Sequence, residues 1–151
     1  MFKKLLLSSL LVIPIFTHAD WLYFSEDGEY TTYIDPERIT SSSKSAYFTD
    51  LESITSSSKS VKYADFWIKM VIHTDITKDG LSVGDQKIVK YKMKCDSNEY
   101  AVAAVYHYKK SGMVNNSEVS TYPIFRLVIP DSRAEQMAKF VCGYLYGEHQ
   151  E

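Results

Sequence analysis

The chain from residue 21 to residue 129 is patterned mainly in period two, with aromatic and β-branched residues at alternate positions, as in half-buried β-strands. Turn-forming pairs, among them Asp27-Gly28 and Ser97-Asn98, separate the patterned segments. The pattern predicts strands over residues 21–24, 29–34, 63–74, 88–96, 100–108, 113–118 and around 124–129. We expect an antiparallel sheet of about six strands.

The pattern changes to helical spacing just after Pro130. Ser132 and Glu135 have the spacing of a capping box, in which each side chain satisfies a backbone N–H group of the first turn. An apolar stripe follows and consists of Ala134, Met137, Ala138, Val141 and Leu145. Either Gly143 or Gly147 can end this helix. The expected fold class is therefore α+β, with one C-terminal helix packed on one face of the sheet.

Residues 1–19 have the three zones of a secretory signal peptide. Lys3 and Lys4 precede an uncharged run from Leu5 to Phe16, and Thr17-His18-Ala19 offers small residues at both recognition positions of a cleavage site. The uncharged run has about a dozen residues, whereas a helix that spans a bilayer needs roughly 20, so a permanent membrane anchor fits less well. Cleavage after Ala19 would leave residues 20–151 as a single domain, a size that one core can stabilise.

The charge balance argues against a nucleic-acid partner. The chain has 17 lysine and arginine residues against 19 aspartate and glutamate residues, and removal of Lys3 and Lys4 makes it more acidic. Nucleic-acid binding requires a basic footprint, which this balance does not supply. No second apolar stretch is long enough to span a membrane.

The chain has two cysteines, Cys95 and Cys142. An exported chain enters an oxidising compartment, where a pair of thiols normally forms a disulfide. The bond would close a loop of about 48 residues and stabilise the fold by about 4 kcal/mol on the chain-entropy estimate. A nucleophilic thiol or a metal ligand is the alternative, but neither cysteine lies in a CxxC pair or a Cys/His cluster.

The disulfide predicts which face of the sheet the helix covers. Cys95 shares one face of its strand with Val89, Tyr91 and Met93, and the opposite face carries Lys90, Lys92 and Lys94. A bond from Cys95 to the helix requires the helix to cover the first of these faces. In the strand 63–74, the covered face then receives Phe66, Ile68, Met70 and Ile72, and the open face receives Trp67, Lys69, Val71 and His73.

A two-residue turn at Ser97-Asn98 predicts the register of the hairpin around it. On the covered face it pairs Cys95 with Tyr100, Met93 with Val102 and Tyr91 with Ala104. On the open face it places Lys94 beside Ala101, Lys92 beside Ala103 and Lys90 beside Val105, and His107 falls on the same side as these small residues. Small neighbours leave room for the lysine stems to lie flat while the ammonium groups reach water.

The candidate binding surface is the open face, with the contact residues Trp67, Lys69, Lys90, Lys92 and Lys94. A partly exposed tryptophan beside lysines is typical of a recognition surface, because aromatic side chains concentrate binding energy. The alternative is an ordinary solvated β-face whose lysines discourage edge-to-edge association.

Residues 39–45 and 54–60 both read ITSSSKS, and the offset of 15 residues indicates a tandem duplication. A single repeat of this length is too short to build a solenoid. We expect the duplicated Ser/Lys segment 39–60 to form an enlarged surface loop or an extra hairpin, because loop insertions cost little stability. A binding role for this segment is the alternative.

The chain contains no nucleophile elbow, phosphate-binding loop, dinucleotide-binding motif or zinc-protease motif. His73 and Asp75 form a lone H-x-D pair, which is too small a set for a metal site. His107 has no acid or nucleophile near it in the sequence. A glycosidase-type carboxylate pair stays open, because the separation it needs is spatial. We expect a protein that is not an enzyme and that has neither a metal site nor an obligatory cofactor.

Several segments, taken in order, resemble the surface-adhesin protein E family of Gram-negative bacteria. They are Trp21, Tyr33-Ile34-Asp35 followed by Ile39, the strand around Trp67, the Lys/Tyr-rich strand ending at Cys95, the hairpin 106–112, and Ile129-Pro130-Asp131-Ser132 through to Cys142. The resemblance covers nearly all of the chain beyond residue 20. It implies an antiparallel sheet with a C-terminal helix tied to it by the disulfide, and it leaves a homodimer open.

The resemblance also implies binding to host proteins, since the best-known members bind vitronectin, laminin and plasminogen, and haem binding has been attributed to the family. Lipid-anchored members carry a cysteine directly after the signal peptide, whereas this chain has Asp20 and Trp21 there. We therefore expect an exported protein without a lipobox cysteine, in the periplasm, at the cell surface or secreted. The expected function is a non-enzymatic binding domain for host or envelope proteins. A periplasmic small-ligand or haem-binding protein that uses His73, His107 or a tyrosine is the alternative.

Overall fold

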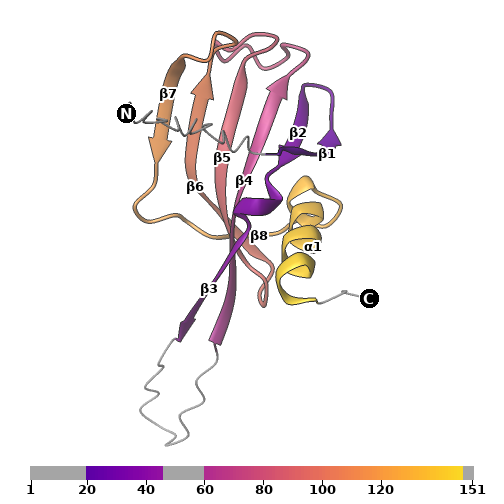
Figure 1. Ribbon diagram of the computed structural model, residues 1–151, viewed down its shortest axis with the longest axis vertical. Coiled ribbons are helices and arrows are strands. Elements are labelled where there is room, and N and C mark those ends of the chain that lie inside the picture. Colours follow the sequence, from indigo (N-terminus) through magenta and orange to yellow (C-terminus); the bar gives the residue numbers. More distant parts are fainter. Residues whose placement is uncertain (1–19, 46–59, 148–151) are drawn as a thin grey trace, which may run out of the picture.

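The computed structural model describes residues 20–45 and 60–147 (Figure 1). The elements in this part of the chain are β1 (Leu22–Glu26), β2 (Tyr30–Ile34), the 3-10 helix η1 (Pro36–Arg38), β3 (Thr40–Ser45), β4 (Ser60–Ile72), β5 (Gln86–Lys94), β6 (Glu99–Tyr108), β7 (Val114–Val119), β8 (Arg126–Leu127) and α1 (Arg133–Tyr146). The fold class predicted from the sequence, an antiparallel sheet with one C-terminal helix, is confirmed. The expected signal peptide lies outside the described residues.

The strands form one antiparallel sheet in the order β1-β2-β4-β5-β6-β7. β4 is central, because β2 pairs with its second half, β3 with its first half and β5 along its other edge. β8 pairs with the start of β6, and β7 pairs with its second half, from Ala104 to Tyr108. In Figure 1, β3 and the beginning of β4 extend beyond the rest of the sheet.

The first ITSSSKS copy supplies β3, which pairs antiparallel with the start of β4 from Thr40–Asp65 to Ser45–Ser60. Ser60, the last residue of the second copy, is thus the first residue of β4. Residues 46–59 lie outside the described part of the chain. The role of the duplication stays a prediction.

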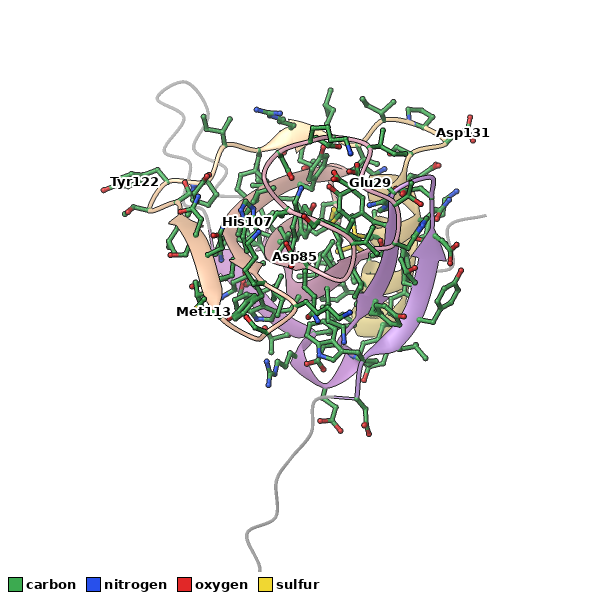
Figure 2. All side chains as sticks on the ribbon, turned by 90° about the horizontal axis from the view of Figure 1, so that it is seen from above. Glu29, Asp85, His107, Met113, Tyr122 and Asp131 are labelled. Carbon is green, nitrogen blue, oxygen red and sulfur yellow. A yellow bond between two sulfur atoms is a disulfide. The ribbon has the colours of Figure 1, made fainter. Side chains whose placement is uncertain are left out.

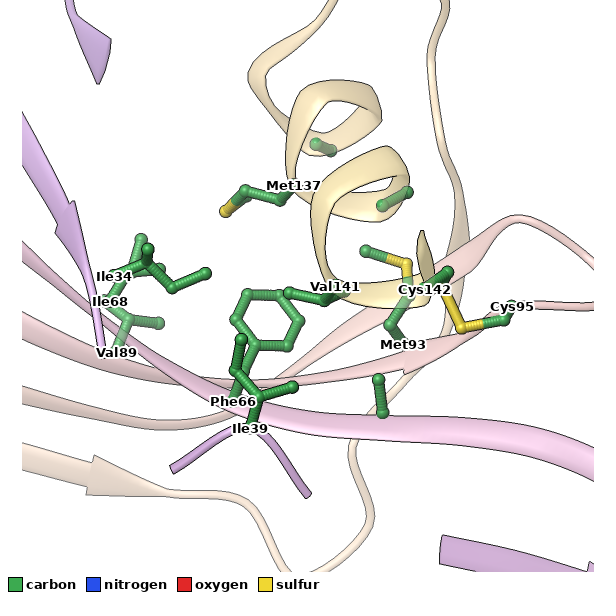
Figure 3. Packing of buried hydrophobic residues seen from close by; sticks show 13 residues of the cluster. Ile34, Ile39, Phe66, Ile68, Val89, Met93, Cys95, Met137, Val141 and Cys142 are labelled. Atoms are coloured by element: carbon green, nitrogen blue, oxygen red, sulfur yellow. A yellow bond between two sulfur atoms is a disulfide. The ribbon is translucent and has the colours of Figure 1, made fainter. Parts of the chain in front are cut away.

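Helix α1 packs on one face of β4 and β5, and the main core lies between them (Figure 3). Phe66 and Ile68 of β4 and Val141 of α1 are fully buried, each with 0% of its surface exposed. The predicted stripe of the helix faces this core, since Ala134, Met137, Ala138 and Val141 are buried and Leu145 packs against the cluster. The helix therefore covers the face that the sequence pattern predicted.

Both ends of α1 are capped by the residues that the sequence pointed to. The Ser132 hydroxyl accepts a hydrogen bond from the backbone N–H of Glu135. The Glu135 carboxylate accepts from the N–H of Asp131 at 2.9 Å, one residue earlier than an ideal capping box requires. Gly147 ends the helix in the left-handed conformation, with φ of 65°.

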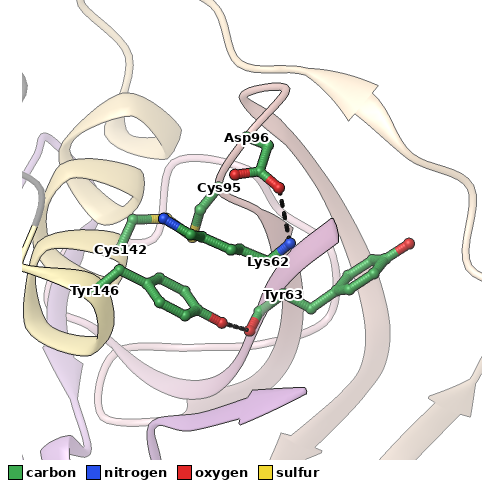
Figure 4. The surroundings of a disulfide bond; sticks show 6 residues. All are labelled: Lys62, Tyr63, Cys95, Asp96, Cys142 and Tyr146. Atoms are coloured by element: carbon green, nitrogen blue, oxygen red, sulfur yellow. Dashed lines mark hydrogen bonds between the residues drawn. A yellow bond between two sulfur atoms is a disulfide. The ribbon is translucent and has the colours of Figure 1, made fainter. Parts of the chain in front are cut away.

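The predicted disulfide is present and joins Cys95, directly after β5, to Cys142 in α1, with Cα atoms 5.7 Å apart (Figure 4). Two hydrogen bonds lie beside it. The Tyr146 hydroxyl donates to the carbonyl oxygen of Tyr63 at 2.7 Å, and the backbone N–H of Lys62 donates to the Asp96 carboxylate at 2.8 Å. Together these contacts hold the end of α1 against the start of β4 and the turn after β5.

The turn between β5 and β6 is longer than predicted and takes four residues, 95–98. Met93 therefore pairs with Tyr100 and not with Val102, and Tyr91 pairs with Val102 and not with Ala104. On the other face, Lys94 pairs with Glu99 and Lys92 with Ala101. The predicted register is wrong by two residues, but a shift of two leaves every side chain on its predicted face.

A β-bulge then changes the faces further along β6. Lys90 pairs with Ala104 while Tyr91 pairs with Val102, so Ala103 is the additional residue. Beyond the bulge, Val105 pairs with Val89 and packs against the core. The predictions that Lys90 lies beside Val105 and that His107 shares a side with Ala101 are therefore wrong.

A buried carboxylate fixes the loop between β4 and β5. Asp85, labelled in Figure 2, is 4% exposed. Its oxygens accept hydrogen bonds from the Lys109 ammonium group at 3.0 Å and from the N–H groups of Ser82 at 2.9 Å and Lys110 at 2.8 Å. The Lys109 hydrogen bond and the two backbone N–H donors hold the pKa of the Asp85 carboxyl below its ordinary value. Asp85 thereby connects this loop to the turn between β6 and β7.

Candidate binding surface

The five predicted contact residues lie together on the face of the sheet opposite α1, on the central strands β4 and β5. Trp67 pairs with Lys90, and Lys69 is the next residue on the same face of β4. Lys92 pairs with Asp65, and Lys94 pairs with Tyr63. Strand alternation places all of them opposite the buried residues Phe66, Ile68 and Met93. We call this side the open face.

Three of the β5 lysines, Lys90, Lys92 and Lys94, lie on the open face, and each has a partner there. Lys90 lies over the Trp67 ring, with its nitrogen 5.7 Å from the ring centroid. Lys92 forms an ion pair of 2.7 Å with Asp65, and Lys94 forms one of 2.8 Å with Glu99. The Lys94 ammonium also lies 4.2 Å from the centroid of the Phe125 ring. This row of lysines is therefore less basic than their number suggested.

Lys69 lies between two aromatic rings. Its nitrogen is 4.9 Å from the centroid of Trp21 and 4.9 Å from that of Tyr33. Partial burial among these rings lowers the pKa of the Lys69 ammonium group, because desolvation disfavours the charged form. The ring faces offset part of this cost through cation–π attraction. The sequence pattern predicted this site from β4 and β5 alone. Tyr33 of β2 and Trp21, the residue before β1, also belong to it.

Trp67 is the centre of an aromatic and cationic cluster on the open face. The centroid of its ring lies 6.1 Å from that of Tyr106 on β6, and the Lys90 ammonium group lies over the ring. Lys69 and Lys90 are the two cations of the cluster, and aromatic rings contact both. A surface of this kind can bind a partner through ring contacts together with one or two acidic groups.

Sequence reasoning missed the residues that neutralise or stack on the lysines. Asp65 is two residues before Trp67, so its position on the open face could have been found from strand alternation. Glu99 faces Lys94 only because the turn has four residues. Phe125 and Trp21 approach from segments far away in the sequence, and no local signal predicts those contacts.

Asp35, from the Tyr33-Ile34-Asp35 segment of the family resemblance, has a structural role at the start of η1. Asp35 is buried, accepts a hydrogen bond from the backbone N–H of Glu37 at 3.2 Å, and lies 3.2 Å from the Arg38 side chain. It caps η1, which follows directly. This side chain therefore holds the connection between β2 and β3.

The two histidines named as candidates lie in different environments. His73 contacts the Asp27 carbonyl oxygen and the Thr74 hydroxyl, both at 2.9 Å. His107 lies on the α1 side of the sheet, and in the strand register it stands opposite Lys87 of β5 and Asn116 of β7. Within residues 20–45 and 60–147, no group of three or more His, Cys, Asp or Glu side chains is placed to hold a metal ion. The geometry adds no support for the haem-binding alternative.

The described residues form a small sheet-and-helix domain, with α1 tied to one face of the sheet by a disulfide and the other face left open. The chain belongs to the surface-adhesin protein E family, whose model matches residues 21–143. The match includes both cysteines and all five predicted contact residues, and it confirms the resemblance found in the sequence. Family membership supports a surface-adhesin-like binding role and an exported or surface location.

Neither a curated protein nor a solved structure matches the chain in the corresponding comparisons. In the part of the chain that the structure describes, no helix combines the length and the apolar character needed to cross a membrane.

Proposed function

We propose that this chain is exported and acts as a non-enzymatic binding domain that recognises a host or envelope protein through the open face. The observation that carries the proposal is the cluster of Trp67, Lys69 and Lys90 on the face that α1 leaves uncovered. Membership in a family of surface adhesins supports the same role. The partner that suits this cluster presents an acidic group beside an apolar patch.

The cluster fits a protein partner because it combines two kinds of contact. The aromatic rings supply apolar area at a low cost in side-chain entropy. The two cations supply electrostatic selection, which weakens as the salt concentration rises. Lys92 and Lys94 contribute less net charge, because Asp65 and Glu99 already neutralise them.

A charge-reversal experiment tests the proposal. The double variant Lys69→Glu/Lys90→Glu is compared with the control Lys78→Glu/Lys139→Glu, which makes the same charge change at two exposed side chains away from the open face. Binding of the mature protein to immobilised vitronectin, laminin and plasminogen is measured by surface plasmon resonance. We expect at least one partner to bind, with an affinity about tenfold lower in the first variant and unchanged in the control.

Equal binding by both double variants would exclude the open face, and binding to none of the three proteins would count against a host-protein partner. Lys92 and Lys94 are left unchanged in this design, because their side chains are only 36% and 23% exposed, and glutamate there would face Asp65 or Glu99 with little screening by water. The control lysines also have carboxylate partners, but their side chains are 72% and 58% exposed, so water screens the new glutamates.

Export and assembly have their own tests. N-terminal sequencing of protein from the periplasm and the medium is expected to begin at Asp20. Sedimentation of the mature chain distinguishes a monomer from the homodimer that the family resemblance leaves open.

A further inference from the structure

A recess of about 420 Å³ lies at one end of the open face, where the segment between β7 and β8 approaches β3, β4 and β5. Its lining includes Ser42, Tyr63, Lys92, Thr121, Tyr122 and Phe125. The volume is within the range of small-molecule sites, about 300–1,000 Å³. This recess lies beyond the Trp67 cluster and has a different chemistry.

One side of the recess is aromatic. The Phe125 ring packs against that of Tyr63, with centroids 6.2 Å apart and ring planes at 65°. Tyr122 is 87% exposed and projects at the edge of the molecule in Figure 2. Burying an aromatic ring is favourable, and the Tyr122 ring is not buried by the protein itself. A ligand that covered this ring would therefore bind more tightly.

The other side of the recess is polar, and the positive charge of Lys92 there is neutralised by Asp65. Lys92 is ion-paired with Asp65 at 2.7 Å, and Asp65 also accepts a hydrogen bond of 3.3 Å from the Ser42 hydroxyl. The Ser42 oxygen can still accept a hydrogen bond, and the Lys92 ammonium has further N–H groups to donate. Thr121 adds another hydroxyl. The recess therefore offers donors and acceptors without a net charge.

We propose that this recess binds one neutral pyranose unit of a glycan. A pyranose ring has an apolar C–H face, which stacks on an aromatic ring such as Tyr122, and a rim of hydroxyls, which pair with Ser42, Thr121 and Lys92. An anion would have to draw Lys92 away from Asp65, and a cation would meet the Lys92 charge. A purely apolar side chain would leave the polar groups without partners, at a cost in free energy.

The glycan subsite does not depend on the protein-binding proposal, although Lys92 belongs to both regions. The two are separable because the Trp67 cluster uses Lys69 and Lys90, whereas neither of these lysines lines the recess. The Lys69→Glu/Lys90→Glu variant is therefore expected to keep its glycan binding when its protein binding is lost.

The test uses the mature protein and three neutral oligosaccharides as probes: chitotriose, maltotriose and lactose. Saturation-transfer NMR detects which of them binds, and titration gives the dissociation constant. We expect at least one probe to bind, about tenfold more weakly or not at all in Tyr122→Ala. The matched control is Tyr144→Ala, which removes a 60% exposed tyrosine from α1 and leaves binding unchanged.

Three results would overturn the glycan subsite. They are absence of a signal from all three probes, equal binding by Tyr122→Ala and the wild type, and equal losses in Tyr122→Ala and Tyr144→Ala. Because Tyr122 is almost fully exposed, its substitution is expected to leave the fold intact, and a thermal unfolding curve for each variant checks this.

Discussion

Cys95 and Cys142 are 47 residues apart in the sequence and 5.7 Å apart at their Cα atoms, joined by the disulfide that fixes α1 to the sheet. Cys95 is the first residue after β5, and Cys142 is buried in the face of α1 that packs on the core. The disulfide and the core packing of Phe66 and Val141 both hold α1 against the same face of the sheet. Together they leave the opposite face of the sheet as the open face.

We predict that Cys95→Ala/Cys142→Ala lowers the free energy of unfolding by about 2–4 kcal/mol, because the unfolded chain gains the conformational freedom that the loop removed. Urea unfolding with and without a reductant measures the effect. The reductant should destabilise the wild type and leave the double variant unaffected. Equal stability of the two proteins without the reductant would contradict the prediction.

Phe66→Ala should lower the free energy of unfolding by about 3–5 kcal/mol, because it removes a ring that is fully buried between β4, Tyr91 and α1. The exposed substitution Tyr122→Ala serves as the control and should change stability by less than about 0.5 kcal/mol. Chemical unfolding of both variants at neutral pH provides the comparison. A loss below 1 kcal/mol for Phe66→Ala would show that this contact is not central to the core.

Gly84→Ala should destabilise the protein by about 1 kcal/mol or more, because Gly84 has φ of +90° and a Cβ there would lie 3.0 Å from the Lys110 side chain. Gly28→Ala is the matched control, since its new Cβ would meet only Ile76 at an ordinary 3.6 Å. Thermal unfolding should separate the two variants by several degrees. A Gly84→Ala protein as stable as Gly28→Ala would refute the strain argument.

Asp85 should make the fold sensitive to acid. Its pKa is lowered in the folded state by the Lys109 hydrogen bond and two backbone donors, so its contribution is present above the ordinary value of 3.8 and is lost as pH falls below it through the folded-state pKa. The loss of stability between pH 7 and pH 3 should be larger for the wild type than for Asp85→Asn. Glu118→Gln, at an exposed position of β7, is the control and should follow the wild type.

The amino-acid sequence by itself determined the features that depend on nearby residues. Strand alternation assigned Phe66 and Trp67 to opposite faces, because successive side chains of a strand point in opposite directions. The spacing of Ser132 and Glu135 set the start of α1. The two cysteines, in a chain expected to be exported, predicted the bond that selects the covered face.

Only the tertiary structure decided how the strands meet. The four-residue turn and the bulge at Ala103 shift the partners of β5, because pairing depends on turn geometry and packing as well as on alternation. The same long-range contacts bring Asp65 and Glu99 beside the lysines, and Trp21 onto Lys69. The pattern along the chain located the open face, but its charge was set by residues brought together from distant segments.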